Sequence, residues 1–265
     1  MDAFVDERDY RLLERDRYTF FVLRRIIGGD CSLLLSDHRD LILCYTGQPY
    51  PVWIWTANGV SSAVMEKAYG LAAEHGLIVK DMRFNVKYEL AEYLTDRAAR
   101  DGMKLSVSTN MFAYDCPEPV KPAVQADGCI HRCGMEDLDE LAEFLDLFHR
   151  EIGIDQKDAL SYREDARRHI ETGNMYLWKD GQGSSVASCK YAPSGGMAAV
   201  NLVFTRPAYR RRHYAENLVY RVTVAAKEAG YLPMLYTDAD YAASNACYEK
   251  IGYVLRGKLC TVAVG

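Results

Sequence analysis

The second half of the chain alternates between two hydrophobic periods, that of a helix and that of a strand. In "MEDLDELAEFLDLFHREIG" apolar residues recur every three or four positions, which predicts an amphipathic helix. The apolar face consists of Leu138, Leu141, Phe144, Leu145 and Phe148. "HYAENLVYRVTVAAKEAG" has the same period and ends at Gly230, a residue typical of helix ends. Short apolar runs such as "GGMAAVNLVFT" and "PMLYTD" predict strands.

These patterns predict a full order of elements for residues 128–265. A strand, "CIHRCG", precedes the first helix, and a more polar helix, "ALSYREDARRHIETG", follows it. Two strands joined by a Gly-rich turn, "NMYLWKDGQGSSVASCKYA", come next. The chain ends with a short helix, "AASNACYEKIG", and a pair of strands or one bent strand, "YVLRGKLCTVAV". The predicted order is β-α-α-β-β-β-α-β-α-β, an α/β fold with a mixed central β-sheet flanked by helices.

The first half repeats much of this order. A helix is expected over residues 8–26, and from "CSLLLS" onward the pattern is β-β-β-α-β-α-β. We therefore expect a duplicated architecture, with an N-terminal α/β domain at residues 1–116 and a second domain at residues 128–265. Residues 117–127 are rich in proline and lack apolar periodicity, which predicts an extended linker.

Composition narrows the class of protein. The chain has 265 residues, of which 49% are hydrophobic, as in ordinary folded proteins. Its net charge of −5 argues against nucleic-acid binding, which needs a basic surface. A local basic cluster in such a protein instead favours a small anionic ligand.

The cysteines and the start of the chain bear on its compartment. Most of the eight cysteines lie in apolar runs, as buried reduced thiols of cytoplasmic proteins do. Cys129 and Cys133 lack a second ligand pair at suitable spacing, so no metal is expected. The chain begins without the apolar segment of a signal peptide and has no run of about 18 apolar residues. We expect a cytoplasmic protein with no membrane contact.

"FTRPAYRRRHYAENLVY" places four arginines, Arg206, Arg210, Arg211 and Arg212, where a strand is expected to become a helix. Positive charge is unfavourable there, because a helix N-terminus already carries partial positive charge. Such a turn also directs unpaired backbone N–H groups to one point. A bound pyrophosphate, held by these amides and the arginines, explains the arrangement. The alternative is a solvated helix start whose arginines pair with the protein's own acids.

This segment, together with "LYTDADYAASNACYEKIGY", resembles the GNAT superfamily of acyl-CoA-dependent N-acyltransferases. The family signature R/Q-x-x-G-x-G/A enters a long helix after a central strand, and here it reads Arg210–Ala215. Further on, the family usually has a short helix ending in Tyr and then a Gly-aromatic pair, here Tyr248, Gly252 and Tyr253. The resemblance covers about residues 128–265, and the first domain is expected to be a degenerate copy.

The resemblance implies transfer of an acyl group, most simply acetyl, from acetyl-CoA to a primary amine of a small molecule or peptide. The amine would attack directly in a ternary complex, with no metal, in a monomer or homodimer. The strand end and the basic turn would bind coenzyme A. The implied cofactor-binding residues are Leu202, Val203, Phe204, Thr205, Arg210, Arg211, Arg212, His213, Tyr214, Ala215 and Asn245.

Tyr248 is the catalytic residue that the resemblance implies. A phenol beside the CoA sulfur can protonate the leaving thiolate, whereas the alternative is a tyrosine that only packs the short helix. No general base is assigned. The acids Glu151, Asp155 and Asp238 are candidates, but each is typical of a surface or structural acid, and a water chain is the alternative.

Two departures from the family pattern leave a second interpretation open. Both glycines common in this turn are absent, and Arg211 and His213 stand in their places. Glycine allows unusual φ values and close backbone approach there. Tyr241 stands where the family often has Asn. The alternative function is therefore a non-catalytic acyl-CoA-binding or scaffold protein with an eroded cofactor turn.

Overall fold

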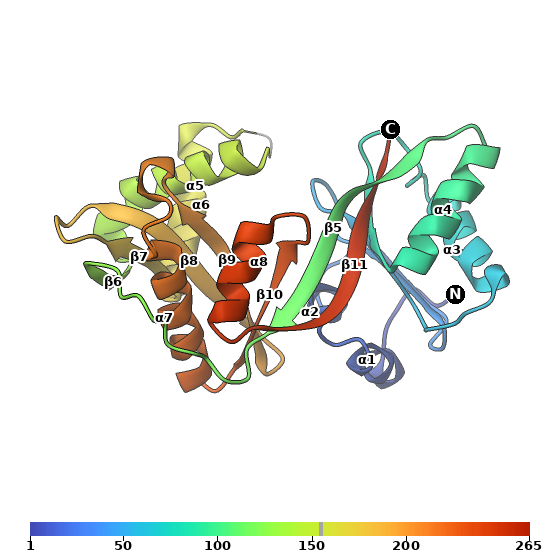
Figure 1. The fold of residues 1–265 in the computed structure, drawn as a ribbon. Helices are drawn as coiled ribbons and strands as arrows, with labels where there is room; N and C mark the ends of the chain where they lie inside the picture. Colours follow the sequence, from blue (N-terminus) through green and yellow to red (C-terminus); the bar gives the residue numbers. More distant parts are fainter. Residues whose placement is uncertain (154–155) are drawn as a thin grey trace. The chain divides into compact units, whose positions relative to one another are not determined.

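The computed structural model describes residues 1–153 and 156–265, which divide into two compact units (Figure 1). Unit 1 consists of Met1–Tyr114, Tyr236–Ala242 and Leu255–Gly265, and unit 2 of Asp115–Leu235 and Ala243–Val254. The units are therefore not contiguous in sequence, because the last strand of the chain belongs to the sheet of unit 1. The contiguous division at residues 117–127 remains a prediction about domains.

Unit 1 is a mixed sheet with helices on both faces. Its helices are α1 (Glu7–Glu14), α2 (Phe21–Ile26), α3 (Ser62–Glu74) and α4 (Tyr88–Arg100). Its strands, in sheet order, are β1 (Leu33–Ser36), β2 (Leu41–Tyr45), β3 (Val52–Thr56), β4 (Arg83–Val86), β11 (Val254–Val264) and β5 (Leu105–Asp115). The chain end, expected as two strands or one bent strand, forms the single strand β11.

Alternation along β2 explains why both faces of this sheet are covered. Leu41 and Leu43 point to the core formed with α3 and α4, whereas Ile42 and Cys44 point to the core formed with α1 and α2. All four side chains are fully buried. A strand that is apolar at every position thus separates two helical layers.

The helix expected over residues 8–26 is interrupted, and that prediction was wrong in its length. α1 ends at Glu14 and α2 begins at Phe21. Between them the carboxylate of Asp16 turns inward, where it accepts hydrogen bonds from Trp55 Nε1 (2.7 Å) and Lys87 Nζ (2.6 Å). Because these buried donors need an acceptor, a long-range contact overrides the local helical pattern.

Unit 2 follows the predicted order of elements as far as the last helix, and the final predicted strand lies in unit 1. Its helices are α5 (Leu138–Ile152), α6 (Ala159–Glu171), α7 (Tyr214–Glu228) and α8 (Ala242–Lys250). Its strands, in sheet order, are β10 (Leu232–Asp238), β9 (Met197–Thr205), β8 (Ser185–Ser194), β7 (Met175–Lys179) and β6 (Cys129–Arg132). The predicted α/β class, a mixed sheet flanked by helices, is confirmed.

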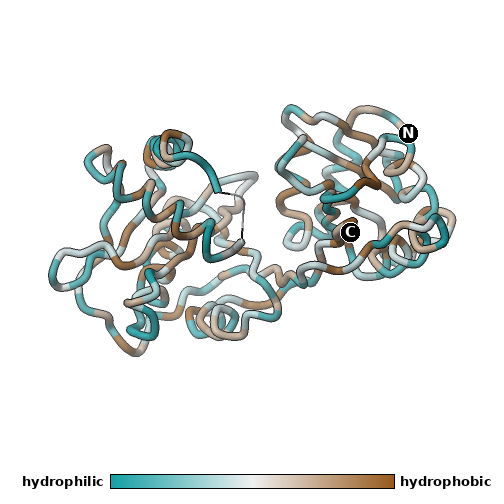
Figure 2. Tube along the Cα trace, turned by 90° about the horizontal axis from the view of Figure 1, so that it is seen from above, coloured by the Kyte–Doolittle hydropathy of each residue, from teal (hydrophilic) through white to brown (hydrophobic). Residues whose placement is uncertain are grey.

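Two helical layers enclose the sheet of unit 2 (Figure 1). On one face Leu177 and Phe204 pack with Phe144 of α5 and Tyr162 of α6. On the other face lies α7, whose buried side includes Leu218 and contacts β7, β8 and β9. Figure 2 shows hydrophobic segments inside each unit and hydrophilic segments mostly along its outer parts.

The proline-rich segment predicted to be a linker lies along unit 2. Val120 N donates to Ile251 O (2.7 Å), Asn217 Nδ2 donates to Val124 O (3.0 Å), and Asp127 accepts a hydrogen bond from Tyr214 (2.6 Å). These contacts begin near α8 and end at the first turn of α7. The segment is therefore held in place at both ends of its course. Within the described residues, no helix is both long and apolar enough to cross a membrane.

Candidate functional site

A β-bulge interrupts β9 shortly before its end. The antiparallel register places Ser188 opposite Phe204 but Lys190 opposite Asn201, so β9 carries one extra residue in this interval. Leu202, within the bulge, has a φ of +51°, and its carbonyl accepts a hydrogen bond from Ser188 Oγ (3.0 Å). The bulge bends β9 and changes the direction of its backbone groups. No glycine or other sequence signal marks this position.

The far side of β9 loses its neighbour at the same place. β9 and β10 run parallel, and their register ends with Ala199 opposite Met234, although β9 continues to Thr205. The predicted residues 202–205 therefore lie beyond the last registered pair. The hydroxyl of Thr205 is buried without a hydrogen-bond partner in the described part of the chain. Backbone and hydroxyl groups of this kind favour a polar ligand alongside the strand.

The turn after β9 adopts the backbone conformation that glycine would allow. After a 3₁₀ turn at Pro207–Tyr209, Arg211 and His213 both have a φ of +64°. His213 stands at the glycine of the signature R/Q-x-x-G-x-G/A, and Arg211 stands at a position where glycine is common in that turn. Left-handed backbone costs a non-glycine residue about 1 kcal/mol or more. The substitutions therefore leave the shape of the turn in place and add strain to it.

Unpaired amides gather where this turn enters α7. The first four N–H groups of a helix have no acceptor within it, and the N-cap residue, His213, makes no side-chain cap. Among the described residues, no acceptor is found for the amides of Tyr214 and Ala215. The imidazole of His213 instead pairs with Glu216, at 3.2 Å between Nδ1 and Oε2. Amides at a helix N-terminus form an anion-binding position.

Two of the four arginines are already paired within the protein. The Arg206 guanidinium meets Glu143 of α5 through two contacts, at 2.9 and 3.2 Å. Arg210 pairs with Glu151 at 2.9 Å and donates to the backbone oxygen of Thr205 at 3.2 Å. These two arginines therefore follow the alternative interpretation, in which the arginines pair with the protein's own acids.

The other two arginines are available to a ligand. Arg211 and Arg212 are both exposed, and within the described residues neither forms an ion pair. The guanidinium of Arg212 lies 5.6 Å from the ring centre of Tyr209. Exposed cations beside unpaired helix amides are suited to a phosphate or pyrophosphate group.

The side chain of Tyr214, one of the predicted cofactor-binding residues, points to the proline-rich segment. Its hydroxyl donates to Asp127 Oδ1 at 2.6 Å, and this hydrogen bond raises the pKa of Tyr214 to about 12. The same bond, together with the amide of Gly181, lowers the pKa of Asp127. Tyr214 thus offers its backbone amide to the turn while its phenol fixes the segment before β6. No sequence motif marks this role of Asp127.

α8 carries the predicted residues Asn245 and Tyr248 three positions apart, on one helical face. Both side chains are buried. The ring of Tyr248 packs edge-on against Tyr253 at 5.8 Å. Cys247 lies between these two residues in sequence. Burial, and after it the charge of Glu216, raise the pKa of Cys247 to about 11, so α8 lies within electrostatic range of the first turn of α7. The packing of Tyr248 fits both interpretations of this residue, and its catalytic role stays a prediction.

The acids considered as bases occupy different environments. Glu151 forms the ion pair with Arg210. Asp238 ends β10 and accepts a hydrogen bond from the amide of Asp240 (2.9 Å). Asp155 lies outside the described residues. No base is assigned.

A cavity of about 810 Å³ lies between α5 and α6, separate from the turn and from Tyr248. Acidic residues of this cavity form ion pairs with neighbouring arginines, Asp139 with Arg163 at 2.9 Å and Asp146 with Arg150 at 2.5 Å. Charge compensation of this kind leaves the cavity without a strong preference for either sign of ligand.

In unit 1 the equivalent opening between parallel strands is filled by a side chain. The parallel register of β3 and β4 pairs Val52 with Phe84 and Trp53 with Asn85, whereas β3 continues to Thr56. There Lys87 Nζ donates to Thr56 O (2.8 Å), Asn58 Oδ1 (2.6 Å) and Asp16 Oδ2 (2.6 Å). Three acceptors match the three protons of the ammonium group. The backbone of β3 is therefore occupied by the protein itself, and no sequence motif announced this.

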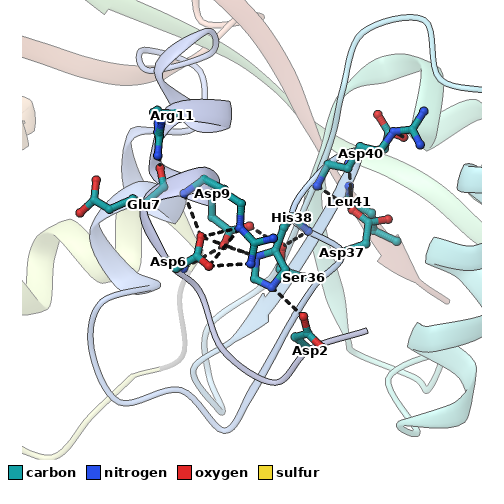
Figure 3. A network of polar contacts seen from close by, with 12 residues as sticks. Asp2, Asp6, Glu7, Asp9, Arg11, Ser36, Asp37, His38, Asp40 and Leu41 are labelled. Atoms are coloured by element: carbon teal, nitrogen blue, oxygen red, sulfur yellow. Dashed lines mark hydrogen bonds and ion pairs between the residues drawn. The ribbon is translucent and has the colours of Figure 1, made fainter.

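The groups of a second polar cluster in unit 1 are also hydrogen-bonded to one another. His38 Nδ1 lies 2.7 Å from Asp9 Oδ2 and His38 Nε2 lies 2.8 Å from Asp2 Oδ2 (Figure 3). Asp9 is completely buried and is also bonded to Ser36 Oγ and to the amide of Asp6. Burial opposes protonation of His38, but its hydrogen bonds to the carboxylates outweigh burial and raise its pKa. The cluster attaches the start of the chain to β1.

Comparison with known proteins agrees with this geometry. A sequence profile of the acetyltransferase (GNAT) family matches residues 138–253. An acetyltransferase of the GNAT family from Colwellia psychrerythraea is similar in structure, with a TM-score of 0.59, 11% identity, and coverage of 98% of this chain and 97% of its own. A GCN5-related N-acetyltransferase from Kribbella flavida gives a TM-score of 0.55, 16% identity, and coverage of 99% and 96%.

A tandem GNAT protein from the clavulanic acid biosynthesis pathway is also similar, with a TM-score of 0.52, 13% identity, and coverage of 84% of this chain and 78% of its own. At such identities the likeness concerns the fold, and it extends over both units. Curated proteins offer no match in sequence. Residues 138–253, which contain the bulged strand, the basic turn and α8, form an acetyltransferase domain of the GNAT family.

Proposed function

We propose that the protein is an N-acetyltransferase that moves an acetyl group from acetyl-CoA to a primary amine. The observation that carries this proposal is the turn between β9 and α7, where two exposed arginines meet amides that have no acceptor in the described part of the chain. An anion of high charge density is the ligand that such a position favours. The family of residues 138–253 supports coenzyme A as that ligand.

We assign the two ends of the cofactor to different parts of the site. The pyrophosphate would lie against the amides of Tyr214 and Ala215, with Arg211 and Arg212 beside it. The pantetheine arm would bond to the backbone of residues 202–205, which extend beyond the register with β10. The αL conformation of the turn supports a functional cofactor loop, because the strained backbone is kept although both glycines are absent.

The transfer would proceed by direct attack of the amine on the thioester carbonyl. The bond from carbon to sulfur breaks, and Tyr248 would donate its proton to the leaving thiolate. The attacking nitrogen loses its proton to water or to a base that we do not name. The acceptor is a primary amine on a small molecule or peptide.

Unit 1 would bind no coenzyme A. Lys87 already occupies the backbone oxygen of Thr56, the group that a pantetheine amide would need. The ion pair of Lys87 with Asp16 is largely buried, with side-chain exposures of 11% and 16%, so its displacement would be costly. We therefore propose one cofactor per chain.

Calorimetric titration with acetyl-CoA tests the cofactor and its stoichiometry. We expect one site per chain, and a stabilisation of about 2.7 kcal/mol when the ligand is present at about a hundred times its dissociation constant. Absence of binding at millimolar acetyl-CoA would overturn the assignment, and two sites per chain would overturn the role given to Lys87.

Release of the CoA thiol tests the reaction. It should be measured across amino acids, polyamines, aminoglycosides and peptide N-termini. Thiol release that depends on one class of amine supports transfer. Binding of acetyl-CoA without thiol release from any amine would instead support the alternative, a non-catalytic acyl-CoA-binding protein.

A further inference from the structure

We propose that Cys31 and Cys44 form a site of reversible oxidation, at which a hydroperoxide converts two neighbouring thiols into a disulfide. Their sulfur atoms lie 3.4 Å apart. Cys31 lies in the connection from α2 to β1, and Cys44 lies on β2 opposite Leu34. In the described part of the chain, no other two cysteine sulfurs are in hydrogen-bond contact.

The two thiols differ in a way that suits sequential roles. Cys31 is half-buried and therefore reachable by a small oxidant, whereas Cys44 is completely enclosed. Burial raises the pKa of the Cys44 thiol, so this thiol stays protonated and inert toward solvent. Cys31 would react first, and Cys44 would resolve the product.

The position of Cys31 is fixed by its backbone surroundings. Its thiol lies 3.3 Å from the carbonyl oxygen of Ile26, the last residue of α2, and 3.6 Å from that of Gly29 in the connection that follows. These contacts keep the sulfur over the face of β2 that Cys44 shares with the core of α1 and α2. Formation of a disulfide would shorten the sulfur–sulfur distance from 3.4 Å to about 2.05 Å.

The chemistry balances with one hydroperoxide and two thiols. The Cys31 thiolate attacks a peroxide oxygen, the O–O bond breaks, and the leaving oxygen takes a proton to give water or an alcohol. Cys31 is then a sulfenic acid. The Cys44 sulfur attacks the Cys31 sulfur, the S–O bond breaks, and hydroxide leaves as water with the Cys44 proton. The two cysteines are oxidised by two electrons and the peroxide is reduced.

Peptide mapping of the full chain tests the site. The protein is treated with hydrogen peroxide, its remaining thiols are alkylated, and the fragments are analysed by mass spectrometry. We expect a cross-linked pair of peptides containing Cys31 and Cys44, lighter by two hydrogen atoms and separated again by dithiothreitol. Cys129, which is exposed, should gain oxygen without a cross-link to either residue.

Two variants separate the roles. In Cys44→Ser the cross-link is lost, and Cys31 accumulates as a sulfenic acid that dimedone traps. In Cys129→Ser, the matched control at an exposed thiol, the cross-link persists. If Cys44→Ser does not fold, Cys31→Ser replaces it, because this substitution at the half-buried position should also abolish the cross-link. Gain of oxygen at Cys31 of the unmodified sequence without a cross-link would overturn the proposal.

Discussion

The ammonium nitrogen of Lys87 lies 2.8 Å from the backbone oxygen of Thr56, at the end of a strand that has diverged from its parallel neighbour. In unit 2, β9 continues beyond its last registered pair with β10, and the amides of the turn that follows have no acceptor among the described residues. The two units therefore differ at the point where parallel strands diverge. In unit 1 a lysine of the protein binds the strand backbone, whereas in unit 2 we propose that a ligand does so.

This relationship predicts that Lys87→Met destabilises the protein. The substitution leaves the Asp16 carboxylate and the Thr56 oxygen without their buried donor, at a cost of about 3–5 kcal/mol. Urea denaturation measures the change. Lys67→Met is the control, because Lys67 pairs with Asp37 at a more exposed site and should cost less than about 1 kcal/mol. Equal effects of the two substitutions would mean that Lys87 contributes no more than a surface lysine.

His213→Gly should stabilise the turn and tighten acetyl-CoA binding. Glycine relieves the left-handed strain at a φ of +64°, a gain of about 1 kcal/mol that the added freedom of the unfolded chain partly offsets. Calorimetric titration and urea denaturation provide the two readouts. His75→Gly, on an exposed residue at the end of α3 with ordinary negative φ, is the control and should lower stability. Weaker cofactor binding in His213→Gly would show that the imidazole itself contacts the ligand.

Arg212→Ala should weaken acetyl-CoA binding without changing stability. Arg212 is exposed and forms no ion pair among the described residues, so a phosphate contact would cost about 1–3 kcal/mol of binding on removal. Arg206→Ala is the matched control in the same segment, because Arg206 is held by Glu143. Its titration curve should stay close to that of the unsubstituted protein. Arg210→Ala should have an intermediate effect, since Arg210 must leave Glu151 to reach a ligand.

Stability should fall as pH rises above 6.5, the ordinary pKa of histidine, through the raised pKa of His38. A histidine whose pKa is raised on folding stabilises the protein fully below its unfolded pKa and loses that contribution as it deprotonates. The groups facing it are Asp9, Asp2, Asp6 and Arg8. Urea denaturation across this range measures the slope. His38→Asn should remove the dependence of stability on pH, and His75→Asn should retain it. An unchanged dependence in His38→Asn would mean that another group causes it.

The sequence predicted the elements of unit 2 because their hydrophobic periods are local properties. The helix with Leu138 and the strand ending at Thr205 were both expected from their patterns, and both are present. The break between α1 and α2 was missed, because it depends on Asp16 reaching Trp55 across the fold. The sequence also did not indicate that β11 belongs to unit 1, since a strand's pattern does not specify its neighbour.

For the candidate site, the sequence indicated residue types better than their partners. It predicted the basic turn, and the structure adds that Arg206 and Arg210 are paired with acids of α5, far away in sequence. The bulge at Leu202 carries no local signal, because leucine rarely adopts positive φ. Such features arise from packing that holds a residue in an unfavourable conformation, and this packing is not encoded in a short motif.

Tyr248→Phe should lower the turnover of the proposed reaction by about 10²-fold or more while leaving acetyl-CoA affinity nearly unchanged. The hydroxyl is assigned to protonation of the leaving thiolate, an interaction made chiefly in the transition state. Its loss should therefore appear in kcat and not in the calorimetric dissociation constant. Steady-state thiol release with the best amine from the acceptor panel provides the measurement.

Packing around Tyr248 makes this test interpretable. The ring contacts Tyr253 edge-on at 5.8 Å, and phenylalanine retains that contact, so the melting temperature should change little. Tyr253→Phe is the control, because its hydroxyl pairs with Thr223 at 2.7 Å inside the core and should affect stability more than turnover. If Tyr248→Phe turns over at the unsubstituted rate, the residue only packs α8 and water protonates the thiolate. If turnover falls only in proportion to stability, the hydroxyl holds α8 in place and its role is structural.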